Sequence, residues 1–175
     1  MSEPKEVIEA RENCNNKDYF LNIVKESPML LEWANDEIRD DKKIVLEAVK
    51  KDSGALEFAS DRLKNDKDIL LEATSKSGWT ICYASEKLRD DKDVLLSATK
   101  NDGQALYFAS KRLRDDKDVV LQAITNKPII LKFASLRLRN DKEVITTAIS
   151  KNSKVLEFAS EELQKDEEIL KLCEG

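Results

Sequence analysis

The stretch LEFASDRLKNDKDILLEATSKSGWT, residues 56–80, is one copy of a 25-residue unit that recurs along almost the whole chain. Its opening pentapeptide returns every 25 residues without insertion, as LEWAN at 31, ICYAS at 81, LYFAS at 106, LKFAS at 131 and LEFAS at 156. A second signature, NDKDILLEA at 65, recurs as DDKKIVLEA at 40, DDKDVLLSA at 90, DDKDVVLQA at 115 and NDKEVITTA at 140. A fixed short period of this kind is typical of solenoids, in which each unit packs only on its neighbours.

Each unit has the pattern of two short helices. In the first half, Leu56, Ala59 and Leu63 follow the spacing i, i+3, i+7 and share one helical face. An Asn-Asp pair then offers an N-cap, and the apolar run behind it suits a second helix enclosed by neighbours. We therefore predict helices near 56–64 and 67–76, repeated every 25 residues, and no β-strand.

The predicted fold class is all-α: an α-solenoid of stacked two-helix repeats. We expect one helical-repeat domain over residues 1–175. Residues 6–30 form a degenerate N-terminal cap unit, residues 31–155 form five full repeats, and residues 156–175 form a truncated C-terminal cap unit.

Composition and charge narrow the classes of function. Charged residues make up 37% of the chain, and 35 acids against 30 bases give a net charge of −5, which disfavours a global electrostatic grip on nucleic acid or anionic lipid. Three widely spaced cysteines show no disulfide or metal spacing, and no apolar run is long enough for a signal peptide or a membrane span. We expect a cytoplasmic protein that does not contact membranes.

The consensus LEFAS-x-x-L-x-N-D-K-x-[IV]-[LV]-L-x-A, present in nearly every unit, resembles a family of short tandem helical repeats of bacteria and large viruses. That family is catalogued as a domain of unknown function. The resemblance implies a tandem helical array and brings no chemistry with it.

No residue pattern indicates an enzyme, a metal site or a cofactor. The chain contains no histidine and no glycine-rich phosphate loop. Its acidic clusters recur in register with a lysine in every unit and lack the glycine and glutamate of a calcium loop, so we interpret them as N-caps and surface ion pairs. These clusters include Asp40–Asp41, Asp90–Asp93 and Asp115–Asp118.

One basic residue per unit supports an alternative function, binding to a nucleic-acid backbone. We call this set the basic column; it comprises Arg39, Lys64, Arg89, Arg114 and Arg139. Each base stands beside acids in the sequence, and we find no matching aromatic column for base stacking. We therefore do not expect nucleic acid to be the partner.

The residues that depart from the repeat carry the most information about a binding site. Projected at 100° per residue, the outer face of the first helix is polar or glycine in the unit at 56 but apolar in the middle units. We call these departures the stripe; it comprises Trp79, Cys82, Tyr107, Ile129, Lys132 and Leu136. Exposed apolar patches of this kind mark interaction sites, although Trp79 could instead fold onto Tyr83 and Ile129 could belong to the core.

The function predicted from these observations is a monomeric protein-binding module that uses the stripe. It would act on an unidentified protein as a scaffold, or as an inhibitor or effector that blocks its partner. The alternatives are a nucleic-acid-backbone binder that uses the basic column and a self-assembling structural protein.

Overall fold

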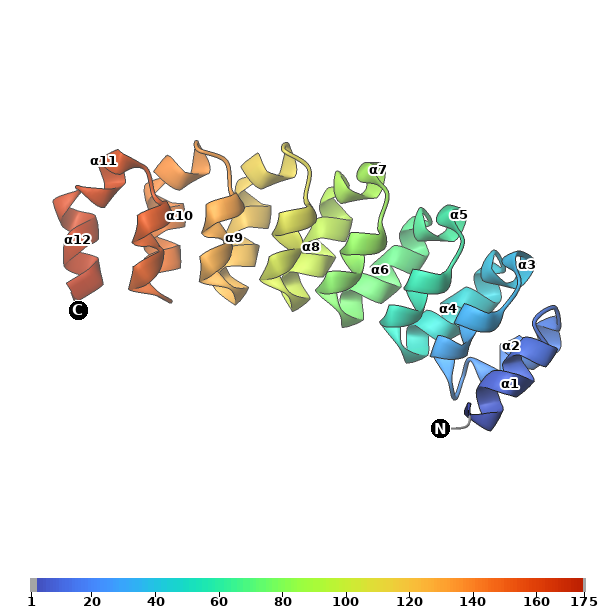
Figure 1. Cartoon of the computed structure of the whole chain (residues 1–175). Helices are drawn as coiled ribbons and strands as arrows, with labels where there is room; N and C mark the ends of the chain where they lie inside the picture. Colours follow the sequence, from blue (N-terminus) through green and yellow to red (C-terminus); the bar gives the residue numbers. More distant parts are fainter. Residues whose placement is uncertain (1–2, 175) are drawn as a thin grey trace.

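The computed structural model describes residues 3–174, with residue 174 described by its backbone only. Residues 1–2 and 175 of the predicted domain lie outside the described residues. The described chain is helical and contains no β-strand, and its units stack side by side into an elongated, curved array with the two termini at opposite ends (Figure 1). The predicted all-α solenoid is confirmed. No helix in the described part of the chain has the length and apolar character needed to cross a membrane.

Each unit contains one long α-helix, which begins where the sequence predicts. Its N-cap is an aspartate in every unit whose cap is defined except the first, where Asn16 takes this place. The long helices are α2 (Lys17–Ile23), α4 (Lys42–Lys51), α6 (Lys67–Lys76), α8 (Lys92–Asn101), α9 (Lys117–Asn126), α10 (Lys142–Ile149) and α12 (Glu167–Glu174).

The predicted helix over 56–64 is wrong in its form, because the structure divides it into two pieces. A six-residue 3₁₀-helix comes first, at η1 (Pro28–Trp33), η2 (Ser53–Phe58), η3 (Gly78–Tyr83), η4 (Gly103–Phe108), η6 (Pro128–Phe133) and η8 (Ser153–Phe158). A shorter helical piece follows, at α3 (Asp36–Arg39), α5 (Asp61–Lys64), α7 (Glu86–Arg89), η5 (Leu113–Asp115), η7 (Leu138–Asn140) and α11 (Glu161–Gln164). In the first unit, α1 (Lys5–Glu12) replaces both pieces.

The division has a physical cause at the Ala-Ser pair between the two pieces. Ala59 is extended, with ψ at 157°, and the backbone N–H of Ser60 donates to the carbonyl of Arg39 in the preceding unit, at 3.0 Å. The Ser60 hydroxyl accepts from the backbone N–H of Leu63 at 3.2 Å and donates to the carboxylate of Asp40. A hydrogen bond between units therefore takes the backbone group that a continuous helix would have used.

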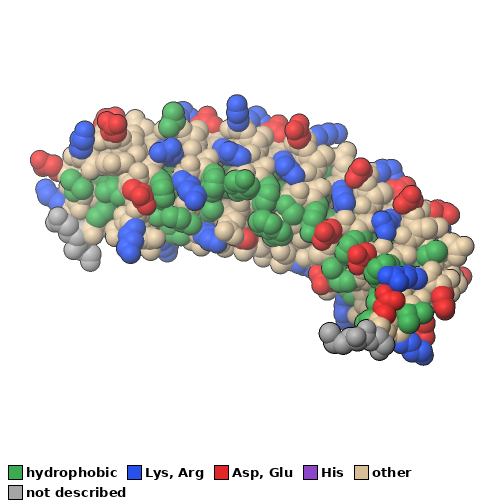
Figure 2. Space-filling model, in the orientation of Figure 1, with side chains coloured by type: hydrophobic (Ala, Val, Ile, Leu, Met, Phe, Trp, Pro, Cys, Tyr) green, Lys and Arg blue, Asp and Glu red, His purple; other side chains and the backbone are tan. Residues whose placement is uncertain are grey.

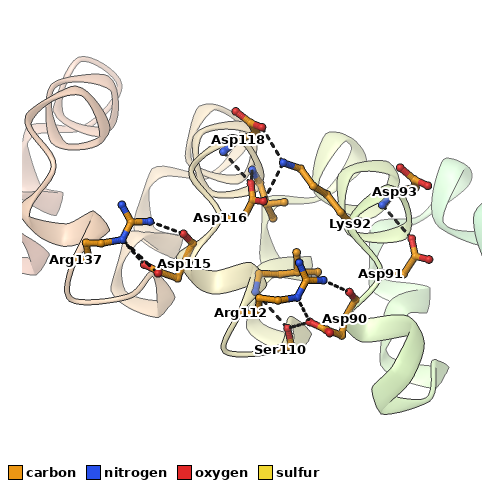
Figure 3. A network of polar contacts seen from close by, with 12 residues as sticks. Asp90, Asp91, Lys92, Asp93, Ser110, Arg112, Asp115, Asp116, Asp118 and Arg137 are labelled. Carbon is orange, nitrogen blue, oxygen red and sulfur yellow. Dashed lines mark hydrogen bonds and ion pairs between the residues drawn. The ribbon is translucent and has the colours of Figure 1, made fainter.

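Ion pairs connect the N-terminus of each long helix to the preceding unit, as the sequence predicts. The Asp91 side chain accepts from the backbone N–H groups of Asp93 and Val94, at 3.0 and 3.2 Å, and its other oxygen lies 2.8 Å from Lys67 Nζ. Figure 3 shows the next step, in which Lys92 lies between Asp116 and Asp118. We call this repeated set the lysine ladder; its pairs are Lys17–Asp41, Lys42–Asp66, Lys67–Asp91, Lys92–Asp116, Lys117–Asp141 and Lys142–Asp166.

The core lies between successive long helices and the 3₁₀-helices beside them. Ala73, Ala98 and Ala123 are fully buried at one position of the long helices, which allows close approach between neighbouring units. A Cβ added at Gly78 would lie 2.2 Å from the carbonyl oxygen of Ala98 in the next unit, and the same Cβ at Gly103 would lie 2.3 Å from that of Ala123. The 3₁₀-helices η3 and η4 are thus held tightly against the next long helix, and this fixes the surface that they present.

Candidate functional site

The 3₁₀-helices place most of the predicted stripe on one exposed face. Residues three apart in a 3₁₀-helix lie above one another, so Trp79 with Cys82 on η3, and Ile129 with Lys132 on η6, point the same way. Trp79 and Tyr107 are each 52% exposed, and Ile129 is 36% exposed. A band of hydrophobic side chains runs along the array, with Lys and Arg side chains beside it (Figure 2).

The aromatic rings of this face form a continuous chain across three units. The Trp79 ring packs edge-to-face on Phe108, with centroids 5.1 Å apart. Phe108 meets Tyr107 at 5.1 Å, and Tyr107 meets Phe133 of the next unit at 5.0 Å, again edge-to-face. Trp79 therefore packs on the following unit and not on Tyr83, the alternative that the sequence left open.

Two open depressions flank Phe133. The first, of about 250 Å³, is lined by Trp79, Gln104, Tyr107, Ile129, Ile130, Lys132 and Phe133. Ile129 is therefore at the surface, and the core position is taken by Ile130, which is 3% exposed. The ammonium group of Lys132 lies 5.1 Å from the centroid of the Phe133 ring, at the rim of this depression.

The second depression, of about 500 Å³, brings in Leu136. It is lined by Lys111, Arg114, Phe133, Ala134, Ser135, Leu136 and Arg139. Leu136 follows the break after η6 and is 77% exposed, the most exposed of the large apolar side chains described. Because Phe133 lines both depressions, the structure joins Leu136 to the rest of the stripe across the division of the helix.

Cys82 lies apart from both depressions. Its side chain is half-buried, and burial raises the pKa of the Cys82 thiol. The neighbouring Tyr83 hydroxyl donates to Glu57 at 3.1 Å; burial, followed by this contact, raises the pKa of Tyr83 to about 12. The structure therefore groups five of the six predicted stripe residues around the depressions and leaves Cys82 beside them.

The arginines of the basic column hold backbone carbonyls. Arg89 Nη2 donates to the carbonyl of Cys82 at 2.6 Å, and Arg114 Nη2 donates to that of Tyr107 at 2.7 Å. In the last unit Gln164, which is uncharged, donates to the equivalent carbonyls of Glu157 and Ala159, at 3.0 and 2.9 Å. An uncharged hydrogen-bond donor therefore serves at Gln164 where other units have a base, which weakens the nucleic-acid alternative.

An aromatic column does exist, and the expectation that none accompanies the basic column is wrong. The last residue of every six-residue 3₁₀-helix is aromatic and half-buried: Trp33, Phe58, Tyr83, Phe108, Phe133 and Phe158. The Arg89 guanidinium lies 5.7 Å from the centroid of the Phe108 ring. The signal was available in the sequence as the third letter of each pentapeptide. Sequence reasoning missed it because three different aromatic residues share the position.

The fold and its repeated contacts define an α-solenoid of short repeats, in which the same lysine–aspartate ion pair joins each unit to the next. Comparison with protein-family models identifies the family to which these repeats belong. Six overlapping segments match the family described as Domain of unknown function (DUF4116), over residues 16–64, 41–89, 66–114, 91–139, 116–164 and 141–173. The chain belongs to this family, which confirms the resemblance seen in the repeats. No curated protein and no solved structure matches the chain.

Successive family matches begin at residues 16, 41, 66, 91, 116 and 141. These are the N-cap positions of successive long helices. The family model therefore starts its unit at the long α-helix, whereas the pentapeptides begin within the 3₁₀-helix.

Proposed function

We propose that this chain is a protein-binding module whose stripe receives apolar side chains of a partner protein. The observation that carries the proposal is the chain of half-exposed rings from Trp79 to Phe133, open to solvent on a face with two depressions. Trp and Tyr are enriched among the residues that dominate interface energetics. Contiguous exposed apolar surface of this kind commonly marks an interaction site.

The needs of the scaffold do not account for the exposed apolar surface of the stripe. At the positions of Trp79 and Ile129, other units carry Gly54 and Lys154; at the position of Tyr107 they carry glutamates. The same backbone therefore forms with polar residues or glycine at these positions. Apart from Met29 near the N-terminal end, the apolar residues at these positions lie in the middle units, and this concentration supports a role in binding.

A module of this kind would act by occupying a surface of its partner. Such occupation blocks or bridges the partner, which is how an inhibitor, an effector or a scaffold works. We place this encounter in the cytoplasm, since three widely spaced cysteines in odd number suit a reducing compartment.

The test is a quantitative capture experiment with two matched baits. The stripe variant Ile129→Lys with Leu136→Glu leaves the ring chain intact and uses residue types found at these positions in other units. The control variant Lys154→Glu with Asp61→Lys alters equivalent exposed positions outside the stripe and likewise leaves the net charge unchanged. We expect proteins from the native host that are retained by wild type and by the control to be lost on the stripe variant. Equal retention on all three baits would contradict the proposal.

A further inference from the structure

We infer that the segment seated on the stripe is an acidic peptide: apolar anchor side chains flanked by aspartate or glutamate. This inference rests on the proposed function and adds the chemistry of the partner. The supporting observations are the charges around the two depressions.

At two repeat positions on the face of the stripe, the middle units lack the acidic residues that other units carry. The position that opens the short helical piece is acidic in the early units and in the last unit, but is Lys111 and Leu136 in the units between. The exposed middle position of the 3₁₀-helix is likewise glutamate near both ends, but Tyr107 and Lys132 in the centre. The acidic counterparts are Asp36, Asp61, Glu86 and Glu161 at the first position and Glu32, Glu57 and Glu157 at the second.

The residues that line the depressions follow the same trend. The two depressions around Phe133 contain no carboxylate, and their charged lining residues are all basic: Lys111, Arg114, Lys132 and Arg139. Equivalent depressions in other units are lined by both acidic and basic residues. The depression at Phe58 is lined by three acids beside two bases, and the depression at Phe108 has Glu86 opposite Arg89.

These four cations also lack carboxylate partners within the described chain. Within the described chain, none of Lys111, Arg114, Lys132 and Arg139 has a carboxylate oxygen within 4.0 Å, whereas the lysine ladder pairs six lysines on the long helices. A rim of unpaired positive charge around an apolar floor is complementary to an acidic segment with apolar anchors.

A polypeptide fits this face better than a nucleic acid does. Leu136 and Ile129 are exposed aliphatic side chains, which offer bases no surface for stacking. The rings stand edge-to-face against one another, so their faces are partly covered. Arg114 also donates hydrogen bonds to the carbonyls of Ala109 and Tyr107, so these N–H groups are not free to bind phosphate. The depression of about 250 Å³ at Trp79 has room for a single anchor side chain.

The experiment is a selection from a random library of short displayed peptides. Peptides are selected on the full-length wild-type chain and depleted on the stripe variant Ile129→Lys with Leu136→Glu. We expect the stripe-dependent peptides to combine aromatic or Leu anchors with an excess of Asp and Glu. Enriched peptides with neutral or basic flanks would overturn the inference and leave the proposed function standing. A selection that yields no stripe-dependent peptide would overturn both.

Charge-reversed variants give the second readout. Lys111→Glu with Lys132→Glu places the residues of other units at both positions; Lys43→Asp with Lys87→Glu changes the charge by the same amount outside the stripe, also with residue types used by other units. In fluorescence anisotropy, the selected acidic peptides should bind the variant Lys111→Glu with Lys132→Glu about tenfold or more weakly than wild type. They should bind the control variant Lys43→Asp with Lys87→Glu as tightly as wild type. Equal affinity for both pairs would overturn the inference.

Single-stranded oligouridine is measured beside the peptides. We expect no stripe-dependent binding of this probe at low salt. The probe could instead bind the variant Ile129→Lys with Leu136→Glu as it binds wild type, and fail to bind the variant Lys111→Glu with Lys132→Glu. That result would show that the cations bind phosphate groups, and it would overturn the peptide inference.

Discussion

Replacing Trp79 by glycine should destabilise the array far more than the repeat itself suggests. The sequence presents Trp79→Gly as harmless, because Gly54 occupies the same position one unit earlier. On that basis only the low helix propensity of glycine would count, at most about 1 kcal/mol. The structure adds a contact between units, since the Trp79 ring packs on Phe108 with centroids 5.1 Å apart.

The magnitude follows from that contact. Trp79 is 52% exposed, so close to half of its surface is buried. Half of a tryptophan side chain is roughly 100 Å², which at about 25 cal/mol per Å² corresponds to about 2.5 kcal/mol. The edge-to-face pair adds about 0.5–1.5 kcal/mol. Because the unfolded chain also covers some of this area, we expect Trp79→Gly to lower the free energy of unfolding by about 2–3 kcal/mol.

Urea unfolding followed by far-ultraviolet circular dichroism measures this loss. A double-mutant cycle with Phe108→Leu should return a coupling of about 0.5–1.5 kcal/mol between the two rings. Leu136→Glu is the control, and we expect it to stay within about 0.5 kcal/mol of wild type, because Leu136 is largely exposed. A loss below about 0.5 kcal/mol for Trp79→Gly, with no coupling to Phe108, would refute the reasoning.

Three further predictions concern the contacts between units. Gly103→Ala should lower the free energy of unfolding by about 1–3 kcal/mol, because its Cβ would meet the carbonyl of Ala123 at 2.3 Å; an unchanged urea midpoint would argue against so close an approach. Ala98→Leu should cost a similar amount or more, since Ala98 is fully buried, and an unshifted melting temperature would contradict that packing. Partial burial opposes the ionisation of Asp91, yet its bonds to Lys67 and to two backbone N–H groups hold the pKa of Asp91 below its ordinary value. The stabilisation is therefore present above about pH 4 and is lost as pH falls through the lower folded pKa, so Asp91→Asn should be less stable at neutral pH and less sensitive to acid; parallel pH profiles would contradict this.

The sequence by itself determined the period, the class of fold and the long helices. These features depend on interactions within a few residues. The N-cap at Asp66 and the apolar run behind it specify α6 whatever lies beside it. The predicted span 67–76 accordingly matches Lys67–Lys76. Most residues of the stripe could also be predicted from the sequence, because a residue that departs from a repeat can be recognised without a structure.

Only the tertiary structure decided how one unit meets the next. The Ser60 N–H bonds to Arg39 in the preceding unit, at the point where the structure divides the predicted helix. The same offset between units selects Phe108 as the neighbour of Trp79 and joins Leu136 to Phe133 in one depression. A repeated sequence specifies what each unit contains, but the shift and rotation between units come from packing across their boundary, where no local pattern records which side chains will touch.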